Sequence, residues 1–242
     1  MQVDVILALP QLSGNTELNN KITVVIDALR ATSTMVTALC HKAIEVIPVA
    51  EPAEAVELAK NIGAQECITG GERRGLRIEG FELGNSPLEY TEQRITGKKI
   101  ILSTTNGTKA VKLAAQGATE VLIGSFLNAQ AVIDHLRTVQ RDAVIVCAGR
   151  GSWGISLEDL ACAGWLIAGL QAAGRELALT DAAKSAGYAY QQAMAVGLEQ
   201  FFRQTDNGRN LIEIGLEPDL AACAAVNSMP ILPRYLNGRV AL

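Results

Sequence analysis

The chain has 242 residues, of which 49% are hydrophobic and 19% charged, and its 21 basic and 25 acidic residues give a net charge of −4. This length and composition indicate a globular protein with one large domain or two small ones. The sequence has no run of Lys and Arg and no interleaving of aromatic with basic residues, which argues against nucleic acid as a partner.

The first part of the chain alternates between strand-like and helix-like segments. Short runs rich in β-branched residues predict strands at residues 3–9, 22–28, 43–49, 66–69, 99–104, 119–125 and 142–148. Amphipathic stretches between them predict helices at residues 33–42, 52–63, 86–94, 107–117 and 128–140. This alternation is typical of βα units around a mostly parallel or mixed sheet flanked by helices, so we expect an α/β fold.

The rest of the chain has a different character. Residues 157–226 are rich in Ala, Leu and Gln, which predicts a set of helices, and 228–235 and 238–242 predict extended structure. No Gly/Ser-rich or Pro-rich linker separates the parts, so we expect one compact domain over residues 1–242 with its helix-rich part packed on the same unit. Two questions stay open: whether this unit divides into lobes at about residue 150, and whether the helical part covers the sheet or forms a homo-oligomer interface.

Cysteine content and the N-terminus indicate the compartment. The five cysteines are scattered and odd in number, without a C-x-x-C pair, and the chain has only two histidines. This pattern predicts reduced, mostly buried thiols and argues against a Cys/His zinc site. Asp4 stands where a signal peptide needs basic residues, and no apolar run approaches the roughly 18–20 residues that span a bilayer. We therefore expect a soluble, cytoplasmic protein without a membrane partner.

Four segments end predicted strands with polar residues. They read VVIDALRATST (24–34), ITGGERRGLRIEGFELGNSP (68–87), LSTTNGT (102–108) and VCAGRGSWGISLED (146–159). In parallel α/β sheets, ligands bind at the carboxyl ends of the strands, where loops converge and helix N-termini point their free N–H groups. We therefore expect these four segments to build a ligand site.

The LSTTNGT segment offers the chemistry of an anion cradle. Thr104, Thr105, Asn106 and Thr108 supply donors, and Gly107 lets the backbone approach a ligand closely. Phosphate is the anion that we expect there. The alternative, that Thr105 or Asn106 only caps a helix and that Asn106 and Gly107 only turn the chain, stays open.

Arginines and carboxylates cluster in the same predicted loops. Guanidinium groups are common partners of phosphate and sulfonate oxygens, and the five that lie there are Arg30, Arg73, Arg74, Arg77 and Arg150. Mg²⁺ typically binds one or two carboxylates together with waters and phosphate oxygens, and the candidates are Asp27, Glu72, Glu158 and Asp159. Taken singly, each arginine could be a solvated surface group, and each acid could be a helix cap or half of a salt bridge.

Other kinds of site fit the sequence poorly. Cys67 and Arg73 have the C-x₅-R spacing of cysteine-dependent phosphatases, but the Gly-rich segment after Arg73 does not predict the helix that would lower the thiol pKa. His41 and His135 lie inside predicted helices, away from the strand ends. A Walker motif and a G-x-G-x-x-G motif after the first strand are both absent from the sequence.

The four polar segments also carry a family resemblance. They resemble the signature blocks of the 2-phosphosulfolactate phosphatase family, whose pattern in the second block centres on GER and GNSP, and the resemblance covers roughly residues 1–235. It implies a Mg²⁺-dependent phosphoric monoester hydrolase that converts 2-phospho-3-sulfolactate to 3-sulfolactate and phosphate, a step of coenzyme M biosynthesis. Two alternatives stay open: a phosphatase for another small phosphorylated 2-hydroxy acid, and a phosphate-ester binding protein without catalysis.

The residues and the resemblance together predict a site for a small anionic substrate. The catalytic candidates are Asp27, Arg30, Glu72 and Arg73. The substrate-binding candidates are Ser33, Asn85, Ser86, Thr104, Thr105, Asn106, Gly107, Thr108 and Arg150. The Mg²⁺ ligands would be Asp27 with Glu72 or Asp159, and Arg150 or Arg77 would bind the sulfonate. Attack by water and a covalent phospho-aspartate at Asp27 both stay open, although Leu29 interrupts the D-x-D pattern usual for the latter.

Overall fold

The computed structural model describes residues 1–12, 18–139, 141–151 and 154–242 of the chain. Within these residues, eleven strands form one sheet. The strands are β1 (Gln2–Ile6), β2 (Ile22–Ile26), β3 (Glu45–Val49), β4 (Cys67–Arg73), β5 (Leu76–Arg77), β6 (Lys99–Ser103), β7 (Glu120–Gly124), β8 (Ala143–Cys147), β9 (Ala178–Leu179), β10 (Arg234–Leu236) and β11 (Arg239–Ala241).

The sheet has the order β5-β4-β6-β3-β11-β10-β7-β2-β8-β1-β9. Strands β4, β6 and β3 are parallel to one another, and so are β7, β2, β8, β1 and β9. Between these two parallel blocks lies the antiparallel hairpin of β10 and β11, which pairs with β7 on one side and β3 on the other. The expected α/β fold with a mixed sheet is confirmed.

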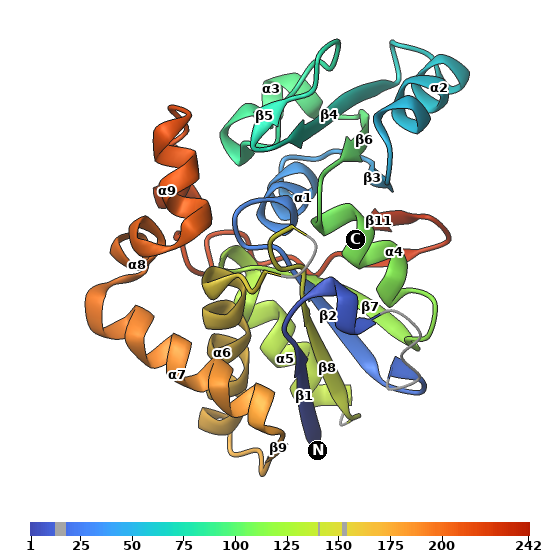
Figure 1. Cartoon of the computed structure of the whole chain (residues 1–242). Helices are drawn as coiled ribbons and strands as arrows, with labels where there is room; N and C mark the ends of the chain where they lie inside the picture. Colours follow the sequence, from blue (N-terminus) through green and yellow to red (C-terminus); the bar gives the residue numbers. More distant parts are fainter. Residues whose placement is uncertain (13–17, 140, 152–153) are drawn as a thin grey trace.

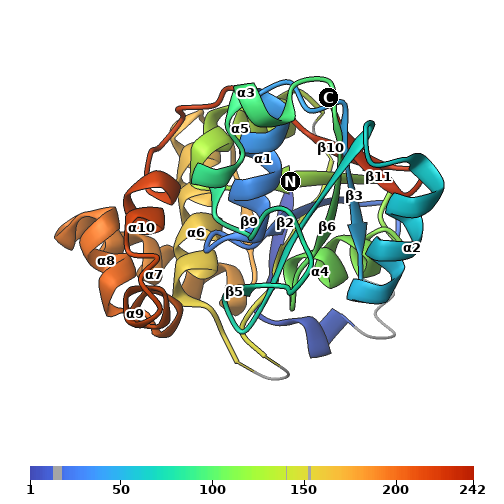
Figure 2. The ribbon, with the colours of Figure 1, turned by 90° about the horizontal axis from the view of Figure 1, so that it is seen from above.

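Helices pack around this sheet (Figures 1 and 2). The α-helices are α1 (Ala31–Cys40), α2 (Pro52–Ile62), α3 (Glu92–Ile95), α4 (Gly107–Ala114), α5 (Ala129–Val139), α6 (Leu157–Ala172), α7 (Asp181–Val196), α8 (Leu198–Gln204), α9 (Asp206–Glu213) and α10 (Pro218–Cys223). The 3₁₀ helices are η1 (Leu9–Leu12), η3 (Pro87–Glu89) and η4 (Phe126–Asn128). Figure 2 shows α7 to α10 on one side of the molecule and α2 on the other.

The central strands are buried on both faces. Every residue of β2 is buried, because Val24 and Ile26 pack into a cluster with residues of α5 and α6 while Val25 packs with residues of α1 and α4 on the opposite face. Such continuous apolar runs are typical of parallel strands covered by helices on both sides. The apolar strands predicted from the sequence therefore form the centre of the molecule.

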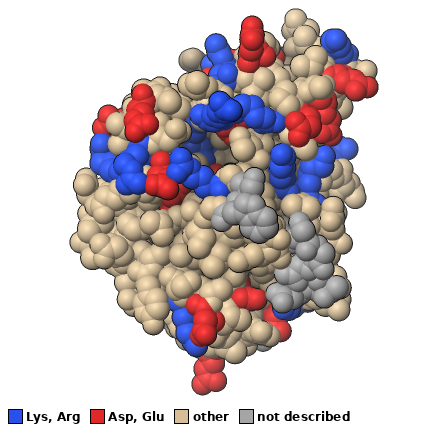
Figure 3. Space-filling view, viewed as in Figure 1, with Lys and Arg blue, Asp and Glu red and all other residues tan. Residues whose placement is uncertain are grey.

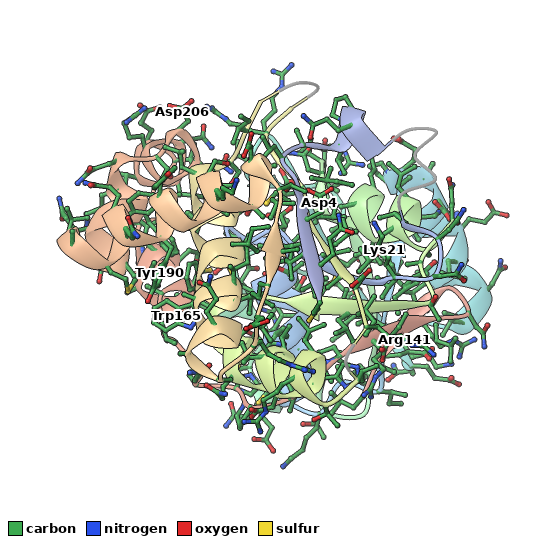
Figure 4. The ribbon with its side chains drawn as sticks, turned by 90° about the horizontal axis from the view of Figure 1, so that it is seen from below. Asp4, Lys21, Arg141, Trp165, Tyr190 and Asp206 are labelled. Carbon is green, nitrogen blue, oxygen red and sulfur yellow. The ribbon has the colours of Figure 1, made fainter. Side chains whose placement is uncertain are left out.

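Helices α6 and α7 lie unusually close together. A Cβ at Gly164 in α6 would come within 2.1 Å of the backbone oxygen of Ala186 in α7, so only glycine fits this crossing. Beside it, Trp165 of α6 and Tyr190 of α7 meet edge to face with ring centroids 5.6 Å apart (Figure 4). This contact fixes α7 on the body of the protein.

The structure departs from some of the sequence-based elements and confirms others. The helix predicted at 86–94 is replaced by η3 and α3, because the backbone oxygen of Tyr90 bonds to the ring of His41 (2.7 Å) and its hydroxyl donates to the oxygen of Gly84 (2.8 Å). The extended structure predicted at the C-terminus is confirmed by β10 and β11, which pair with each other in the middle of the sheet. The short strand β9 lies in the region predicted to be all helical. Residue 140 of one predicted helix and Ser152 and Trp153 of the fourth polar segment lie outside the described residues.

The structure also bears on membrane-spanning helices and on the thiols. Among the described residues, no helix combines the length and apolar character needed to cross a membrane. All five cysteines are free, and all except the half-buried Cys40 are buried. Burial raises the pKa of the Cys147 and Cys162 thiols well above the usual range, which keeps both thiols protonated.

Candidate active site

A cavity of about 410 Å³ opens where several strands end. The loops after β2, β6 and β8, the β4–β5 turn, the loop before η3 and helix α9 contribute to its wall. Figure 3 shows Lys and Arg side chains gathered around the hollow in the upper part of this face. The described residues that line the cavity are Asp27, Leu29, Arg30, Glu72, Arg74, Gly75, Asn85, Thr105, Asn106, Gly149, Arg150, Gly151, Asn207, Asn210 and Leu211.

Asp27 follows the last residue of β2 and reaches the cavity. Its Oδ1 accepts a hydrogen bond from the Ala31 N–H (3.3 Å), and no described residue donates to its Oδ2. A Cβ at Gly107 would lie 2.6 Å from that Oδ2, so α4 begins directly against this carboxylate. Burial raises the pKa of Asp27 to about 7, and the negative charges of Glu72 and Glu158 add to the shift. This carboxyl group can therefore take up or release a proton near neutral pH.

Glu72 joins two loops through one carboxylate. The side chain is buried at the end of β4, with 8% exposed. Its Oε1 accepts from the Thr105 N–H (2.7 Å) and its Oε2 from the Gly75 N–H (2.8 Å). The β4–β5 turn and the loop after β6 thus hold the same carboxylate at the edge of the cavity. Glu72 and Asp27 line one cavity although their strands, β4 and β2, belong to different parallel blocks of the sheet.

Different residues of the loop after β6 have different roles. Thr105 and Asn106 line the cavity, and the Asn106 Nδ2 donates to the oxygen of Gly149 (3.0 Å). Thr104 and Thr108 are buried and bond to each other at the start of α4, with the Thr108 N–H donating to the Thr104 hydroxyl (3.1 Å). The Thr104 hydroxyl thus accepts from the first turn of α4, whereas the alternative interpretation expects Thr105 or Asn106 to cap the helix, and the Asn106 side chain makes no such bond. Only the centre of the loop faces the cavity.

Arg30 is the most deeply buried arginine of the cavity. Its guanidinium is held from two sides, since Nη1 donates to Asp219 Oδ2 (2.8 Å) and Nη2 donates to the backbone oxygen of Gly75 (2.7 Å). The side chains of this ion pair are 3% and 2% exposed. Asp219 belongs to α10, so the C-terminal helices hold a cation that belongs to the strand-end loops.

The other four arginines predicted from the sequence take different positions. Arg73 turns away from the cavity and donates to the oxygen of Ala50 (2.8 Å) and the hydroxyl of Ser103 (3.0 Å). Arg77 lies outside the cavity lining. Arg150 lines the cavity and pairs with Asp206 of α9 (2.9 Å). Arg74 also lines the cavity, and no described residue pairs with its guanidinium.

Two buried acids at the start of α6 support the site from behind. Asp159 does not line the cavity, and its two oxygens accept from the N–H groups of Ala28 (2.8 Å) and Gly149 (3.1 Å). Glu158 accepts from Nδ2 of the cavity residue Asn207 (2.7 Å). Burial raises the pKa of both acids, and for Asp159 the charges of Asp27 and Glu158 raise the pKa further. The structure gives Asp159 the role of a brace between two loops.

Of the remaining residues considered in the sequence, some lie at the cavity wall and others lie away from it. Asn85 lines the cavity with 4% of its surface exposed, and its Oδ1 has no hydrogen-bond partner within the described chain. Ser86 is buried next to it and donates to Asp219 Oδ1 (2.5 Å). The Ser33 hydroxyl donates to the oxygen of Ala28 (2.9 Å), inside α1 and away from the cavity. Cys67 lies in an apolar cluster with Phe81 and Ile101, also outside the cavity lining.

Sequence reasoning missed every residue that the C-terminal helices bring to the site. Asn207, Asn210 and Leu211 come from α9, and Asp219 comes from α10. The sequence of this region predicts only helices, because a helix that docks on a cavity leaves no local pattern of loop residues. The available signal was the spacing of two polar residues. Asn207 and Asn210 are three positions apart, so they lie on the same face of a helix.

Comparisons with known proteins place the chain among phosphatases. The profile of a family described as 2-phosphosulpholactate phosphatase matches residues 7–238. A protein of Clostridium perfringens (strain SM101) is 40% identical over 99% of this chain and 96% of its own length. Proteins of Clostridium acetobutylicum and Symbiobacterium thermophilum are 38% and 39% identical over 99% and 93% of this chain, and over 100% and 96% of their own lengths. All three relatives carry the name probable 2-phosphosulfolactate phosphatase.

Proposed function

Because the chain belongs to the 2-phosphosulpholactate phosphatase family and is thus a phosphoric monoester hydrolase, we propose that it converts 2-phospho-3-sulfolactate to 3-sulfolactate and phosphate. The observation that carries this proposal is the cavity wall, where two carboxylates, Asp27 and Glu72, face the same space as three arginines. A substrate with phosphate, carboxylate and sulfonate groups needs several cationic donors. In this proposal the enzyme acts in the cytoplasm, in a step of the coenzyme M type.

We further propose Mg²⁺ as cofactor, bound by Asp27 and Glu72. No group of three or more His, Cys, Asp or Glu side chains among the described residues could hold a metal ion, but Mg²⁺ usually takes only one or two carboxylates and completes its shell with waters and substrate phosphate oxygens. The Asp27 Oδ2, which accepts no hydrogen bond from a described residue, suits such a ligand. When bound, the ion neutralises phosphate charge and activates or orients a water.

The residues of the chain supply the remaining steps. Arg30, fixed by Asp219, binds phosphate oxygens together with the Thr105–Asn106 segment at the start of α4. Asp27 would hold the ion at Oδ2, where a bound cation keeps the carboxylate ionised, and the attacking water would pass its proton to solvent. The water oxygen bonds to phosphorus while the bond from phosphorus to the C2 oxygen breaks. That departing oxygen receives a proton from solvent and becomes the hydroxyl of 3-sulfolactate.

Release of inorganic phosphate tests this proposal. The purified protein is given 2-phosphosulfolactate, 2-phospholactate and phosphoglycolate, each with Mg²⁺ and with EDTA. We expect release that needs Mg²⁺ and is fastest on the sulfonate ester. Fastest release from another ester would change the substrate, whereas binding of the esters without release would leave an anion-binding protein. If enzyme quenched in acid carries covalent phosphate, the reaction proceeds through a phospho-aspartate at Asp27 and not by direct attack of water.

A further inference from the structure

The turn between β4 and β5 has a conformation that does not suit its first residue. Arg73 pairs with Leu76 across this hairpin, so the turn consists of Arg74 and Gly75 alone. Their φ angles are 55° and 84°, both in the left-handed region. Two-residue turns of this kind favour Asn, Asp or Gly at the first position, and a long side chain there costs stability. An arginine in this position points to a role outside the fold.

The same turn is fixed tightly in place. The Gly75 N–H donates to Glu72 Oε2 (2.8 Å), and the Gly75 oxygen accepts from Arg30 Nη2 (2.7 Å). A Cβ at Gly75 would come within 2.8 Å of Ile214 Cδ1 and 3.1 Å of Asn210 Nδ2, so the turn packs directly against the end of α9. The turn that carries the Arg74 side chain is therefore held by its hydrogen bonds to Glu72 and Arg30 and by its packing against the end of α9.

Arg74 differs from the other two arginines of the cavity in its charge balance. Arg30 is neutralised by Asp219 and Arg150 by Asp206, at 2.8 and 2.9 Å. Within the described chain, Arg74 has neither a hydrogen bond nor an ion pair, and it is exposed at the cavity wall. Asn210, whose Nδ2 would lie 3.1 Å from a Cβ at Gly75, also lines the cavity. An unpaired guanidinium on a turn with a fixed backbone, and an amide packed against the same turn, are donors suited to an anion subsite.

We propose that Arg74, assisted by Asn210, binds the sulfonate group and sets the preference for a sulfonated ester; this inference rests on the proposed function. A sulfonate stays ionised at all physiological pH values and offers three acceptor oxygens, which a guanidinium fork matches. The sequence assigned this role to Arg150 or Arg77. Arg77 lies outside the cavity lining, and Arg150 already shares its charge with Asp206.

Replacing Arg74→Gln tests the inference on a pair of substrates that differ only in the sulfonate. We expect kcat/KM for 2-phosphosulfolactate to fall about 10- to 100-fold, the range for one charge-assisted contact, while kcat/KM for 2-phospholactate changes less than about threefold. Arg94→Gln, an exposed arginine outside the cavity lining, is the matched control and should leave both values unchanged. An equal fall for both esters, or no fall for either, would overturn the assignment.

Two further measurements keep this result separate from the fate of the proposed function. If the wild-type protein hydrolyses neither ester, calorimetric titration with 3-sulfolactate and with lactate decides: weaker 3-sulfolactate binding by Arg74→Gln than by wild type supports the subsite, and equal or absent binding by both overturns it. Arg74→Asn should lose the sulfonate preference while unfolding at the same or a higher temperature, because Asn tolerates the left-handed turn. A lower unfolding temperature would instead make Arg74 a structural residue.

Discussion

The strand-end loops and the C-terminal helices contribute to the same cavity in different ways. Asp27, Glu72, Thr105 and Asn106 reach it because their strands end there, and the direction of each strand dictates their place. Asn207 and Asn210 of α9 and Asp219 of α10 reach it only because these helices pack against the loops. The loops carry the reactive groups, and the helices hold and complete them. Variants that separate these two contributions test the comparison.

Breaking the link between the two regions should have the largest effect. Asp219→Ala leaves Arg30 buried without its counter-ion, which should lower the free energy of unfolding by about 3–5 kcal/mol. Asp206→Ala, which removes the exposed partner of Arg150, is the matched control and should cost less than about 1 kcal/mol. Urea unfolding followed by circular dichroism measures both values.

A double variant then separates support from function at the same place. Arg30→Met with Asp219→Leu replaces the buried ion pair by apolar groups, which should recover most of the lost stability. Its phosphatase activity should stay lost, because the guanidinium that faces the cavity is gone. Equal stabilities of Asp219→Ala and Asp206→Ala would show that α10 does not hold Arg30 as described.

The raised pKa of Asp27 should make the stability of the protein depend on pH. The pKa of Asp27 is about 7 in the folded protein against 3.8 for the free side chain. The folded state therefore binds this proton more tightly, so its contribution to stability is full below pH 4 and is lost as the pH rises through 7. Asp27→Asn cannot ionise and should be more stable than wild type at pH 8, by roughly 2–4 kcal/mol, with a gap that closes toward pH 4.

Unfolding in EDTA at several pH values measures this gap without metal ions. Asp181→Asn, at the exposed start of α7, is the control and should gain no stability at pH 8, because Lys184 lowers the pKa of Asp181. If Asp27→Asn is equally stable relative to wild type at pH 4 and pH 8, burial does not raise the Asp27 pKa.

A smaller effect should distinguish a functional amide from a structural one. The Asn85 Oδ1 is buried without a described partner, so Asn85→Leu should raise the free energy of unfolding by about 1–2 kcal/mol while activity falls. Asn128 has a saturated amide, with bonds to Ser125, Ile123 and Ile231 at 2.9 to 3.1 Å. Asn128→Leu should therefore destabilise the protein, and a similar loss in Asn85→Leu would count against a ligand role for Asn85.

Much of the strand framework and the strand-end part of the site could be predicted from sequence. Apolar runs such as 22–26 become strands because burial on both faces demands them, and a polar residue directly after such a run, like Asp27, lies at the sheet edge. The pairing of β10 and β11 in the middle of the sheet could not be predicted, because local patterns record neither partners nor register.

The direction in which side chains point also could not be predicted from the sequence. Arg73 and Arg74 are neighbours in the sequence, yet one donates to Ala50 and Ser103 while the other lines the cavity. The difference depends on where β4 ends and on the left-handed turn, and the sequence GERRG predicts neither of them. Asp159 likewise follows a strand-end motif but accepts two backbone N–H groups behind the cavity.

The most direct test of the central claim is binding and turnover by Asp27→Asn in the presence of Mg²⁺. Calorimetric titration with 2-phosphosulfolactate is combined with an assay for released phosphate. The account predicts a folded variant that binds the ester at one site per chain and releases phosphate at least about 1,000-fold more slowly than wild type. Turnover at the wild-type rate would contradict it and would remove Asp27, and the cavity built around it, from the reaction.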